Sequence, residues 1–344
     1  MKTIDLNQIT EDELLKVRIC DLPISITGTW LEKCIARLYE ELAAKGLTFR
    51  PACYLADEWL TPEGQTVIGI PFYLAHPALI HLEKKMMLEA EGETEAECMR
   101  LLRHETGHAL CYAYRLNNKR KFRQLFGSSS REYAETYRFR PYSKSYVRHL
   151  EGFYAQYHPD EDFVESFAVW LTPGLDWQTQ YRGWPALKKL QYVDHVMRAI
   201  ANRPPINSRG RKFWRYQAIR STLGRFYARK RKLRAEDLPD FHDNNIRRIF
   251  GSRQKDTLPD IWAADFLRRY RREIIREISF WTSEKKYVIN DLLKKVAHRC
   301  RALKLVVHEP EHIAMMRVVA YLTTLIMNYL YTGWYRGNRK GKVK

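Results

Sequence analysis

The chain has 344 residues, of which 45% are hydrophobic and 29% are charged, and it includes 9 Trp, 21 Tyr and 14 Phe. So many large apolar side chains can form a sizeable core, which excludes a wholly disordered chain, while 16 Gly and 14 Pro exclude a collagen-like or low-complexity one. The formal net charge is +19, and the length predicts about two domains.

The six cysteines are spread along the chain, and none forms a Cys-x-x-Cys pair. They are too sparse for a disulfide framework, so we expect free thiols and a cytoplasmic protein. Residues 1–20 contain four acidic side chains and no apolar core segment, unlike a signal peptide. The most apolar stretch, residues 318–327, is too short to cross a bilayer, so we expect a buried helix and no membrane span.

Charge divides the chain into two unequal parts. Residues 1–200 carry 25 Lys and Arg against 27 Asp and Glu, a net of −2, whereas residues 201–344 carry 34 against 13, a net of +21. The change coincides with residues 203–210, where Pro204 and Pro205 cannot continue a helix. We therefore predict one domain over residues 1–202 and a basic domain over residues 203–344.

The first elements in chain order are a helix and two strands. Thr29 and Glu32 have the spacing of a capping box, which predicts a helix that ends near Gly46. Residues 48–55 and 66–74 have the composition of strands. A proline inside the second segment favours an edge strand or a bulge. These segments predict a small N-terminal sheet.

Helices dominate the rest of the sequence. Apolar periodicity predicts helices over residues 93–115, 160–171 and 184–201, and a mostly irregular segment over residues 117–148. The basic part has helical periodicity nearly throughout. The fold class is therefore predicted as α+β: mainly helical, with a small N-terminal sheet and a basic all-α C-terminal domain.

His104-Glu105-Thr-Gly-His108 matches the HExxH pattern within the predicted helix 93–115. Four residues of helix turn by about 400°, so the two imidazoles point the same way, about 6 Å apart, and can bind one zinc ion. Glu105 is placed to act as a general base on a water activated by that zinc. The alternative is a surface helix with incidental histidines.

A second match, His308-Glu-Pro310-Glu-His312, has a proline between its histidines. Proline inside a helix costs about 3 kcal/mol and removes a backbone hydrogen bond. We expect Pro310 to begin a helix instead, so that this match holds no metal.

A catalytic zinc site needs a third protein ligand. Glu161 and Glu165 are four residues apart on the predicted helix 160–171, so they share a face. One can bind the metal while the other holds a ligand histidine by a hydrogen bond. The alternative is a solvated acidic helix start that suits the helix dipole.

HExxH followed by Glu161-Asp-Phe-Val-Glu165-Ser-Phe resembles the gluzincin zinc metallopeptidases. The nearest likenesses are the lethal-factor-like peptidases, the bacterial cytosolic Mlc-titration-factor peptidases, and uncharacterised bacterial proteins described as zinc-binding metallopeptidases. The resemblance spans roughly residues 48–170 and is specific at the two motifs. It implies a zincin-like domain around an HExxH active-site helix, bound Zn2+, and hydrolysis of a peptide or protein substrate with Glu105 as general base.

The resemblance also implies roles for individual side chains. Glu161 would be the third zinc ligand beside His104 and His108, and Glu165 would support a ligand histidine. Tyr154, seven residues before Glu161, would assist catalysis. The strand predicted over residues 66–74 would line the substrate cleft. The long insert between the two motifs, residues 109–160, and the basic C-terminal part depart from the family and leave the substrate open.

The basic part contains two arginine-rich arrays, and aromatic residues interleave the first of them. Such patterns suit nucleic-acid binding, because phosphates contact cations and bases stack on aromatic rings. The alternatives are an acidic protein partner, or a helical domain whose aromatics are core and whose arginines are solvated or ion-paired. The arrays comprise Arg209, Arg211, Lys212, Arg215, Arg220, Arg225, Arg229, Lys230, Arg231, Lys232 and Arg234, then Arg268, Arg269, Arg271, Arg272 and Arg276.

Two functional hypotheses follow. The first is a zinc-dependent peptidase with a basic helical accessory domain, and the complete HExxH and Glu161 favour it. The second is a nucleic-acid- or anion-binding protein that uses its basic C-terminal part, with an inactive or auxiliary zincin domain, and the charge division favours it.

Overall fold

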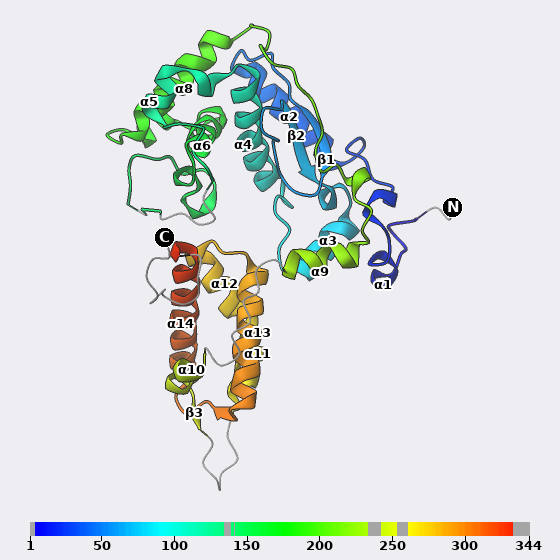
Figure 1. The fold of residues 1–344 in the computed structure, drawn as a ribbon, viewed down its shortest axis with the longest axis vertical. Helices are drawn as coiled ribbons and strands as arrows, with labels where there is room; N and C mark the ends of the chain where they lie inside the picture. The colour runs from blue at the N-terminus through cyan, green and yellow to red at the C-terminus, as the bar shows by residue number, and fades with distance from the viewer. Residues whose placement is uncertain (1–3, 134–138, 141, 233–241, 253–260, 333–344) are drawn as a thin grey trace, which may run out of the picture. The chain divides into compact units, whose positions relative to one another are not determined.

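The computed structural model describes residues 4–133, 139–140, 142–232, 242–252 and 261–332 (Figure 1). These residues form two compact units. The first runs to residue 226 without residues 86–89, and the second comprises residues 86–89 and the chain from residue 227. Most of the chain is helical and a small parallel sheet lies in the first unit, which agrees with an α+β fold.

The two units divide later in the sequence than the charge pattern predicts. Residues 203–226 pack with the first unit, where the backbone amides of Ile206 and Asn207 both donate to the carbonyl of Ala113 at 2.9 Å. The buried Tyr216 also lies in this segment. The double proline therefore begins a strap over the first unit. Net charge depends on ionisable side chains, so the charge pattern carries no information about these backbone hydrogen bonds and places the boundary too early.

The first unit is built mainly from helices, with one pair of strands. Two of its helices, α3 and α9, continue past the division into the second unit. Its elements are α1 (Glu11–Leu14), α2 (Trp30–Ala44), β1 (Ala52–Ala56), β2 (Val67–Pro71), α3 (Pro77–Met87), α4 (Glu95–Ala113), α5 (Arg120–Leu125), the 3-10 helix η4 (Glu151–Gln156), α6 (Pro159–Leu171), α7 (Trp177–Gln180), α8 (Ala186–Ile200) and α9 (Leu223–Lys232).

The capping box predicted at the start of α2 does not form. The Thr29 hydroxyl donates to the carbonyl of Ile26, and the Glu32 carboxylate accepts from the backbone amide of Gly28 at 2.8 Å. Both side chains therefore stabilise the turn before the helix. The helix itself is present because its apolar residues pack in the core.

The strands β1 and β2 pair in parallel, with Tyr54 opposite Gly69. Gly69 also pairs with Leu60 in an antiparallel bridge, so the outer side of β2 is covered at that point. A Cβ atom at Gly69 would lie 2.6 Å from Leu60 Cδ2 and 2.9 Å from Ala56 Cβ. Only glycine fits this close approach. Pro71 is the last residue of β2, where a missing amide breaks no ladder.

Helix α4 occupies the middle of the first unit. It packs against α2 and β2 on one side and against α6 on the other, and α6 packs further against α8 and η4 (Figure 1). All residues of α6 are buried, including four acidic ones. The two helices that carry the sequence motifs are therefore neighbours in the core.

A buried ion pair joins α4 to α2. Arg103 Nε and Nη2 each donate to the Glu41 carboxylate at 2.7 Å, and the two side chains are 7% and 6% exposed. The geometry is bidentate, which is the strongest arrangement of an arginine with a carboxylate. This pair fixes α4 against α2 immediately before His104.

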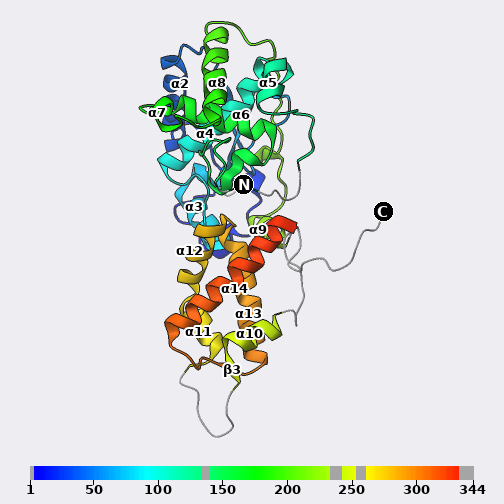
Figure 2. The ribbon, with the colours of Figure 1, turned by 90° about the vertical axis from the view of Figure 1, so that its left-hand side faces the viewer.

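The second unit is a helical cluster around one apolar core. Its two short strands pair antiparallel, so the described part of this unit is not purely helical, whereas the sequence predicted an all-α domain. Figure 2 shows α14 lying across its neighbours α12 and α13. The elements are α10 (Asp243–Ile249), β3 (Gly251–Ser252), α11 (Ala263–Arg269), α12 (Arg271–Thr282), α13 (Lys286–Ala302), β4 (Leu305–Val306) and α14 (Glu311–Thr332).

Within the described part of the chain, α14 alone is long and apolar enough to cross a membrane by length and composition, and 28% of that stretch is buried. The expectation that this stretch is too short is therefore wrong, although several of its residues are buried in the core of the second unit. They are Ala314, Val318, Leu322, Leu325 and Ile326.

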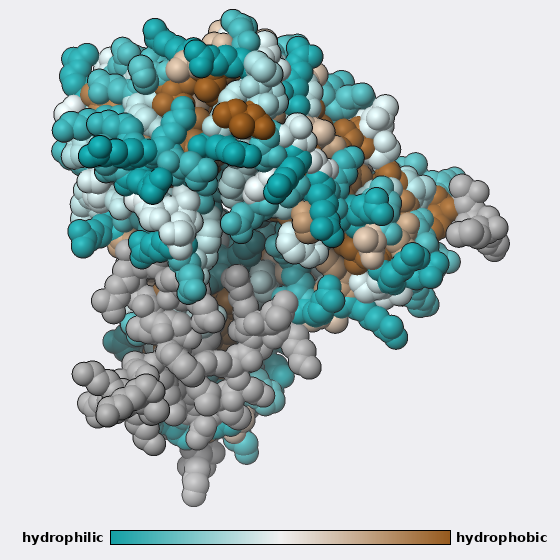
Figure 3. Space-filling view, turned by 45° about the horizontal axis from the view of Figure 1, so that its top comes forward, coloured by the Kyte–Doolittle hydropathy of each residue, from teal (hydrophilic) through white to brown (hydrophobic). Residues whose placement is uncertain are grey.

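Large apolar side chains that are exposed in the described residues are few. On the face in Figure 3, hydrophilic residues predominate and hydrophobic ones form small separate patches. Scattered exposed apolar residues are ordinary on a soluble surface. Two of them, Phe280 and Trp281, are adjacent on α12 and are 73% and 69% exposed.

We predict that Arg103→Met destabilises the first unit by about 3–5 kcal/mol, because Glu41 would keep a buried charge without its main partner. Thermal unfolding of the full chain would measure the loss. Arg37→Met is the matched control: Arg37 is half-exposed and contacts the same carboxylate at 3.4 Å, so its removal should cost less than about 1 kcal/mol. Equal unfolding temperatures for the two variants would contradict the prediction.

Candidate metal centre

The HExxH segment lies on α4, as its pattern predicts. The rings of His104 and His108 are both buried, and their centroids lie 5.2 Å apart. Thr94 caps the helix by accepting from the backbone amide of Glu97. A single regular helix therefore presents both imidazoles to α6.

Glu161 on α6 completes a cluster with the two histidines. Its Oε2 lies 3.2 Å from His104 Nε2 and 3.3 Å from His108 Nε2. Ligand atoms of the three residues all lie within 4.8 Å of one another, and no other group of His, Cys, Asp and Glu in the described residues does so.

The donor set fits a zinc ion. Two imidazole nitrogens and one carboxylate oxygen are ligands that zinc takes in catalytic sites with one open position. Glu161 Oε2 is buried and has no hydrogen bond of acceptable geometry to a described residue. A buried carboxylate oxygen without such a partner is unfavourable unless a cation satisfies it. His104, His108 and Glu161 are thus the residues that could hold the metal.

Glu165 lies one helical turn after Glu161 and contacts His104 from the other side. Its Oε1 lies 2.9 Å from His104 Nδ1, and its Oε2 accepts from the backbone amide of Leu150 at 2.8 Å. Because a carboxylate only accepts, Nδ1 donates to Glu165, and Nε2 is the nitrogen that faces Glu161 and would bind a metal once it has lost its proton. Glu165 thus contacts one histidine and Glu161 faces both, while the metal-binding and supporting roles of the two carboxylates stay a prediction.

The cluster separates the proton affinities of its members. Burial lowers the pKa of His104, but contact with the carboxylates of Glu161 and Glu165 outweighs burial and raises that pKa above its usual range. Burial raises the pKa of Glu161, yet His108 and His104 bring it well below its usual range. Without a metal, the imidazoles therefore hold protons beside ionised carboxylates. A metal ion that binds the imidazole nitrogens has to displace these protons.

Glu105 follows His104 on α4 and is fully within the buried region. Burial raises the pKa of its carboxyl group, and the charges of His104, His108 and Glu161 also act on it. Its Oε2 has no hydrogen-bond partner among the described residues. A buried carboxylate with a free oxygen and a raised pKa can accept and return a proton.

Tyr154 lies in η4, next to His104. The two ring centroids are 5.6 Å apart, and the ring planes are tilted by 54°. Gly152 and Phe153 have φ values of 71° and 56°, which turn the chain sharply before the tyrosine. The structure therefore brings Tyr154 to the cluster.

Two neighbours of Tyr154 could also supply a hydrogen-bond donor, and one of them is engaged elsewhere. His158 caps α6: its Nδ1 accepts from the backbone amide of Asp160, and its Nε2 lies 2.7 Å from the carbonyl of Arg131. Both nitrogens of His158 are occupied. Tyr157 lies beside Tyr154, with ring centroids 5.7 Å apart.

Tyr133 reaches the same cluster, which the sequence did not indicate. Its hydroxyl donates to Glu161 Oε1 at 2.8 Å, and its ring stacks on His158 with centroids 3.9 Å apart. Tyr133 lies in the aromatic, weakly periodic segment predicted as irregular. No spacing or motif distinguishes it from the other tyrosines there.

The remaining acidic residues of α6 are buried, so the alternative of a solvated acidic helix start is wrong. Asp160 accepts a hydrogen bond from the Ser129 hydroxyl, and Asp162 lies 2.6 Å from Lys189 Nζ on α8. Burial raises the pKa of Asp162 to about 7, although Lys189 opposes the rise. Lys189 also donates to the carbonyl of Ser145, which ties the insert to α8.

The second HExxH match is divided by the start of α14. That helix begins at Glu311, directly after Pro310, so His308 lies outside it and His312 within it. The helix thus begins one residue later than expected, and Pro310 directly precedes it. The two histidines do not share a helix face.

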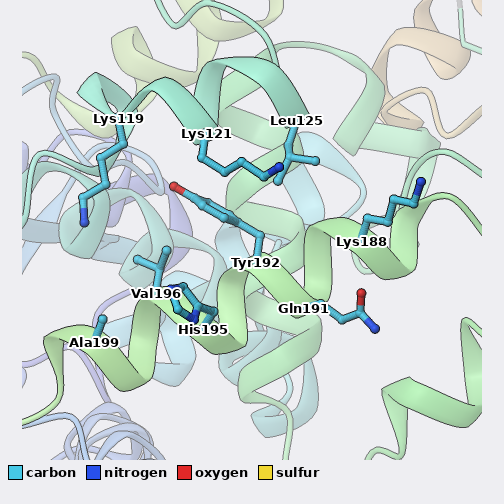
Figure 4. A pocket seen from close by; sticks show the side chains of 9 residues that line it. All are labelled: Lys119, Lys121, Leu125, Lys188, Gln191, Tyr192, His195, Val196 and Ala199. Carbon is cyan, nitrogen blue, oxygen red and sulfur yellow. The ribbon is translucent and has the colours of Figure 1, made fainter.

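A cavity of about 600 Å³ lies between α5 and α8 and includes no residue of the cluster. Figure 4 shows that the ammonium groups of Lys119 and Lys188 lie at opposite ends of it. The cationic side chains therefore do not converge on one point, as they would around a bound anion. The metal cluster remains the candidate functional site.

We predict that Gly107→Val weakens both folding and metal binding. A Cβ at this position would lie 3.0 Å from Val164 Cγ1, 3.1 Å from Phe167 Cδ1 and 3.2 Å from Val164 Cα. The added methyl groups would push α4 from α6, separate the histidines from Glu161 and cost about 1–3 kcal/mol.

Thermal unfolding and zinc titration would measure both effects of Gly107→Val. Gly210→Val is the control, because a Cβ there is exposed and lies 3.5 Å from its nearest neighbour, Val67 Cγ1. Unchanged zinc affinity in Gly107→Val would contradict the prediction.

The comparisons with known proteins agree with this candidate site. A family model described as "Putative zinc-binding metallo-peptidase" matches residues 82–181, less than a third of the chain, and this stretch includes α4, η4 and α6. No curated protein and no solved structure matches the chain significantly. Over residues 82–181 the chain is therefore similar to a zinc-binding metallopeptidase family.

Proposed function

We propose that the chain is a zinc-dependent peptidase and that His104, His108 and Glu161 hold the zinc ion. The observation that carries the proposal is the convergence of three ligand atoms within 4.8 Å beside the buried Glu105 carboxylate. The similarity of residues 82–181 to a zinc-binding metallopeptidase family supports it. Peptides or proteins are the proposed substrates, and the cytoplasmic location stays a prediction.

When bound, zinc would polarise the scissile carbonyl and lower the pKa of a water molecule in its open coordination position. Glu105 would accept the proton of the attacking water and pass it to the leaving amine. Its raised pKa suits both directions of transfer, because such a carboxyl group holds a proton more readily than an ordinary carboxylate does and can still release it. Glu165 would hold His104 in the tautomer that exposes Nε2.

Tyr154 is the proposed hydrogen-bond donor to the carbonyl oxygen as negative charge develops on it. A preorganised donor of this kind contributes about 3–4 kcal/mol to transition-state stabilisation. Its position beside His104 and its seven-residue offset from Glu161 support the proposal. The alternative for Tyr154 is a packing role beside Phe153.

We predict one zinc ion per wild-type chain and its loss in His104→Ala. Glu105→Gln should retain the zinc and lower the rate of peptide cleavage by roughly 10²–10⁴-fold, because the amide cannot accept the proton. Metal analysis together with a peptide-library cleavage assay would measure both results. His195→Ala, an exposed histidine on α8, is the control and should change neither. Stoichiometric zinc in a His104→Ala, His108→Ala double variant would exclude the proposed site.

A second candidate function is nucleic-acid binding by α12. Arg272, Arg276 and Phe280 are exposed at a spacing of four residues, so they share one face of the helix, and Trp281 lies beside them. Cations with adjacent exposed rings suit a single-stranded nucleic acid. By contrast, three of the aromatics in the first arginine array, Tyr216, Phe226 and Tyr227, are core residues, and Arg234 lies outside the described residues.

If α12 binds nucleic acid, Arg272→Glu with Arg276→Glu should weaken binding of a single-stranded oligonucleotide by at least roughly tenfold at low salt. Wild-type affinity should also fall steeply as salt rises, because bound counterions are released. Fluorescence anisotropy would measure both effects, with Arg198→Glu on α8 as the control. Absence of binding to DNA and RNA at low salt would leave a purely structural helix.

A further inference from the structure

Residues 128–133 of the insert lie along the start of α6 and contact it at three places. The three partners, His158, Asp160 and Glu161, lie within one turn of the chain at the start of α6. The contacts are the Ser129 hydroxyl with Asp160 Oδ1, the Arg131 carbonyl with His158 Nε2 at 2.7 Å, and the Tyr133 hydroxyl with Glu161 Oε1 at 2.8 Å.

We propose that Tyr133 is a positioning residue for Glu161, the ligand that α6 would contribute to the metal. Its phenol holds Oε1 and so leaves Oε2 facing the two imidazoles. The inference rests on the proposed function, because it assigns Tyr133 a role in the affinity of that same zinc site.

The carboxylate of Glu161 needs such a restraint. The terminal torsion of a glutamate side chain is broad, so a carboxylate without partners samples many orientations. A hydrogen bond on Oε1 selects the orientation in which Oε2 lies 3.2 Å from His104 Nε2 and 3.3 Å from His108 Nε2. The conformational entropy of the Glu161 side chain is then lost when the protein folds, so it is not lost again when the metal binds.

Tyr133 is itself held in place. Its ring is stacked on the imidazole of His158 at an interplanar angle of 17°, and it meets Tyr157 edge-on with centroids 5.4 Å apart. His158 is fixed in turn by the backbone at Asp160 and Arg131.

The two sides of the cluster are supported in parallel ways. Glu165 orients His104 from within α6, whereas Tyr133 orients Glu161 from the insert. Hydrogen-bond partners of metal ligands typically change metal affinity by 10- to 100-fold when they are removed. The insert between the two motifs would therefore contribute to the metal site directly.

A competing role is possible in chemical terms, because the Tyr133 side chain is 48% exposed. A half-exposed phenol could instead donate to the substrate during the reaction. The two roles differ in what they change: a positioning residue changes zinc affinity, whereas a catalytic donor changes kcat with zinc affinity unaltered. Tyr154→Phe provides the second pattern for comparison.

The test is zinc affinity measured by chelator competition in the wild-type chain and in Tyr133→Phe, which keeps the stacked ring and removes only the hydroxyl. The zinc dissociation constant should rise roughly 10- to 100-fold. Tyr142→Phe is the matched control, since Tyr142 lies in the same insert and is 92% exposed. It should bind zinc as the wild type does. Thermal unfolding of each zinc-free chain checks that the variants are folded.

Wild-type zinc affinity in a folded Tyr133→Phe would overturn the inference and leave the proposed function standing. A drop in kcat with unchanged zinc affinity would also overturn it and assign Tyr133 to the substrate. Failure of the wild-type chain to bind zinc would overturn the proposed function, and the inference with it.

Discussion

The arrangement of the first unit depends on four carboxylates that are buried within about one and a half turns of α6. A buried carboxylate without a partner is strongly unfavourable, so each of the four recruits groups from another part of the chain. The partners come from the insert, from α4 and from α8, and they determine which elements surround α6. They are Ser129 for Asp160, Tyr133 and the two imidazoles for Glu161, Lys189 for Asp162, and His104 with the Leu150 amide for Glu165.

Because these buried carboxylates need partners, the same residues form both the candidate metal site and part of the core. The same contacts that satisfy α6 electrostatically also place the HExxH helix, and close packing at Gly107 lets the two helices approach. Some of these charges are satisfied within the protein, as in the pair of Asp162 with Lys189. Glu161 Oε2 instead faces both histidine Nε2 atoms without a hydrogen bond of acceptable geometry, an arrangement that a bound cation would complete.

Features that depend on neighbouring residues could be predicted from the sequence. The HExxH helix, the acidic helix that follows Pro159 and the helix that begins after Pro310 all come from local periodicity and from proline geometry. The pairing of Glu161 and Glu165 with the histidines could be anticipated because both motifs are regular on a helix.

Features that depend on distant residues could not be predicted in the same way. Tyr133 acts through a contact with a residue 28 positions away, and nothing in its own segment marks it. The strap formed by residues 203–226 is held by backbone hydrogen bonds, which leave no trace in charge or hydropathy. Thr29 and Glu32 have the spacing of a capping box, yet they bond to the preceding turn, because the spacing alone does not fix the path of the chain into α2.

The buried pair of Arg103 and Glu41 has a consequence for how a metal would be acquired. Each helical residue is rotated by about 100° from the one before it, so fixing Arg103 toward α2 also fixes the direction in which the His104 side chain projects from α4. The rotation of α4 about its own axis is thus set by a contact on the side of α2, which does not involve the metal ligands. Zinc fingers fold only as they bind their ion. Here the metal site would already be formed in the folded metal-free protein, and zinc would bind to it as to a rigid chelator.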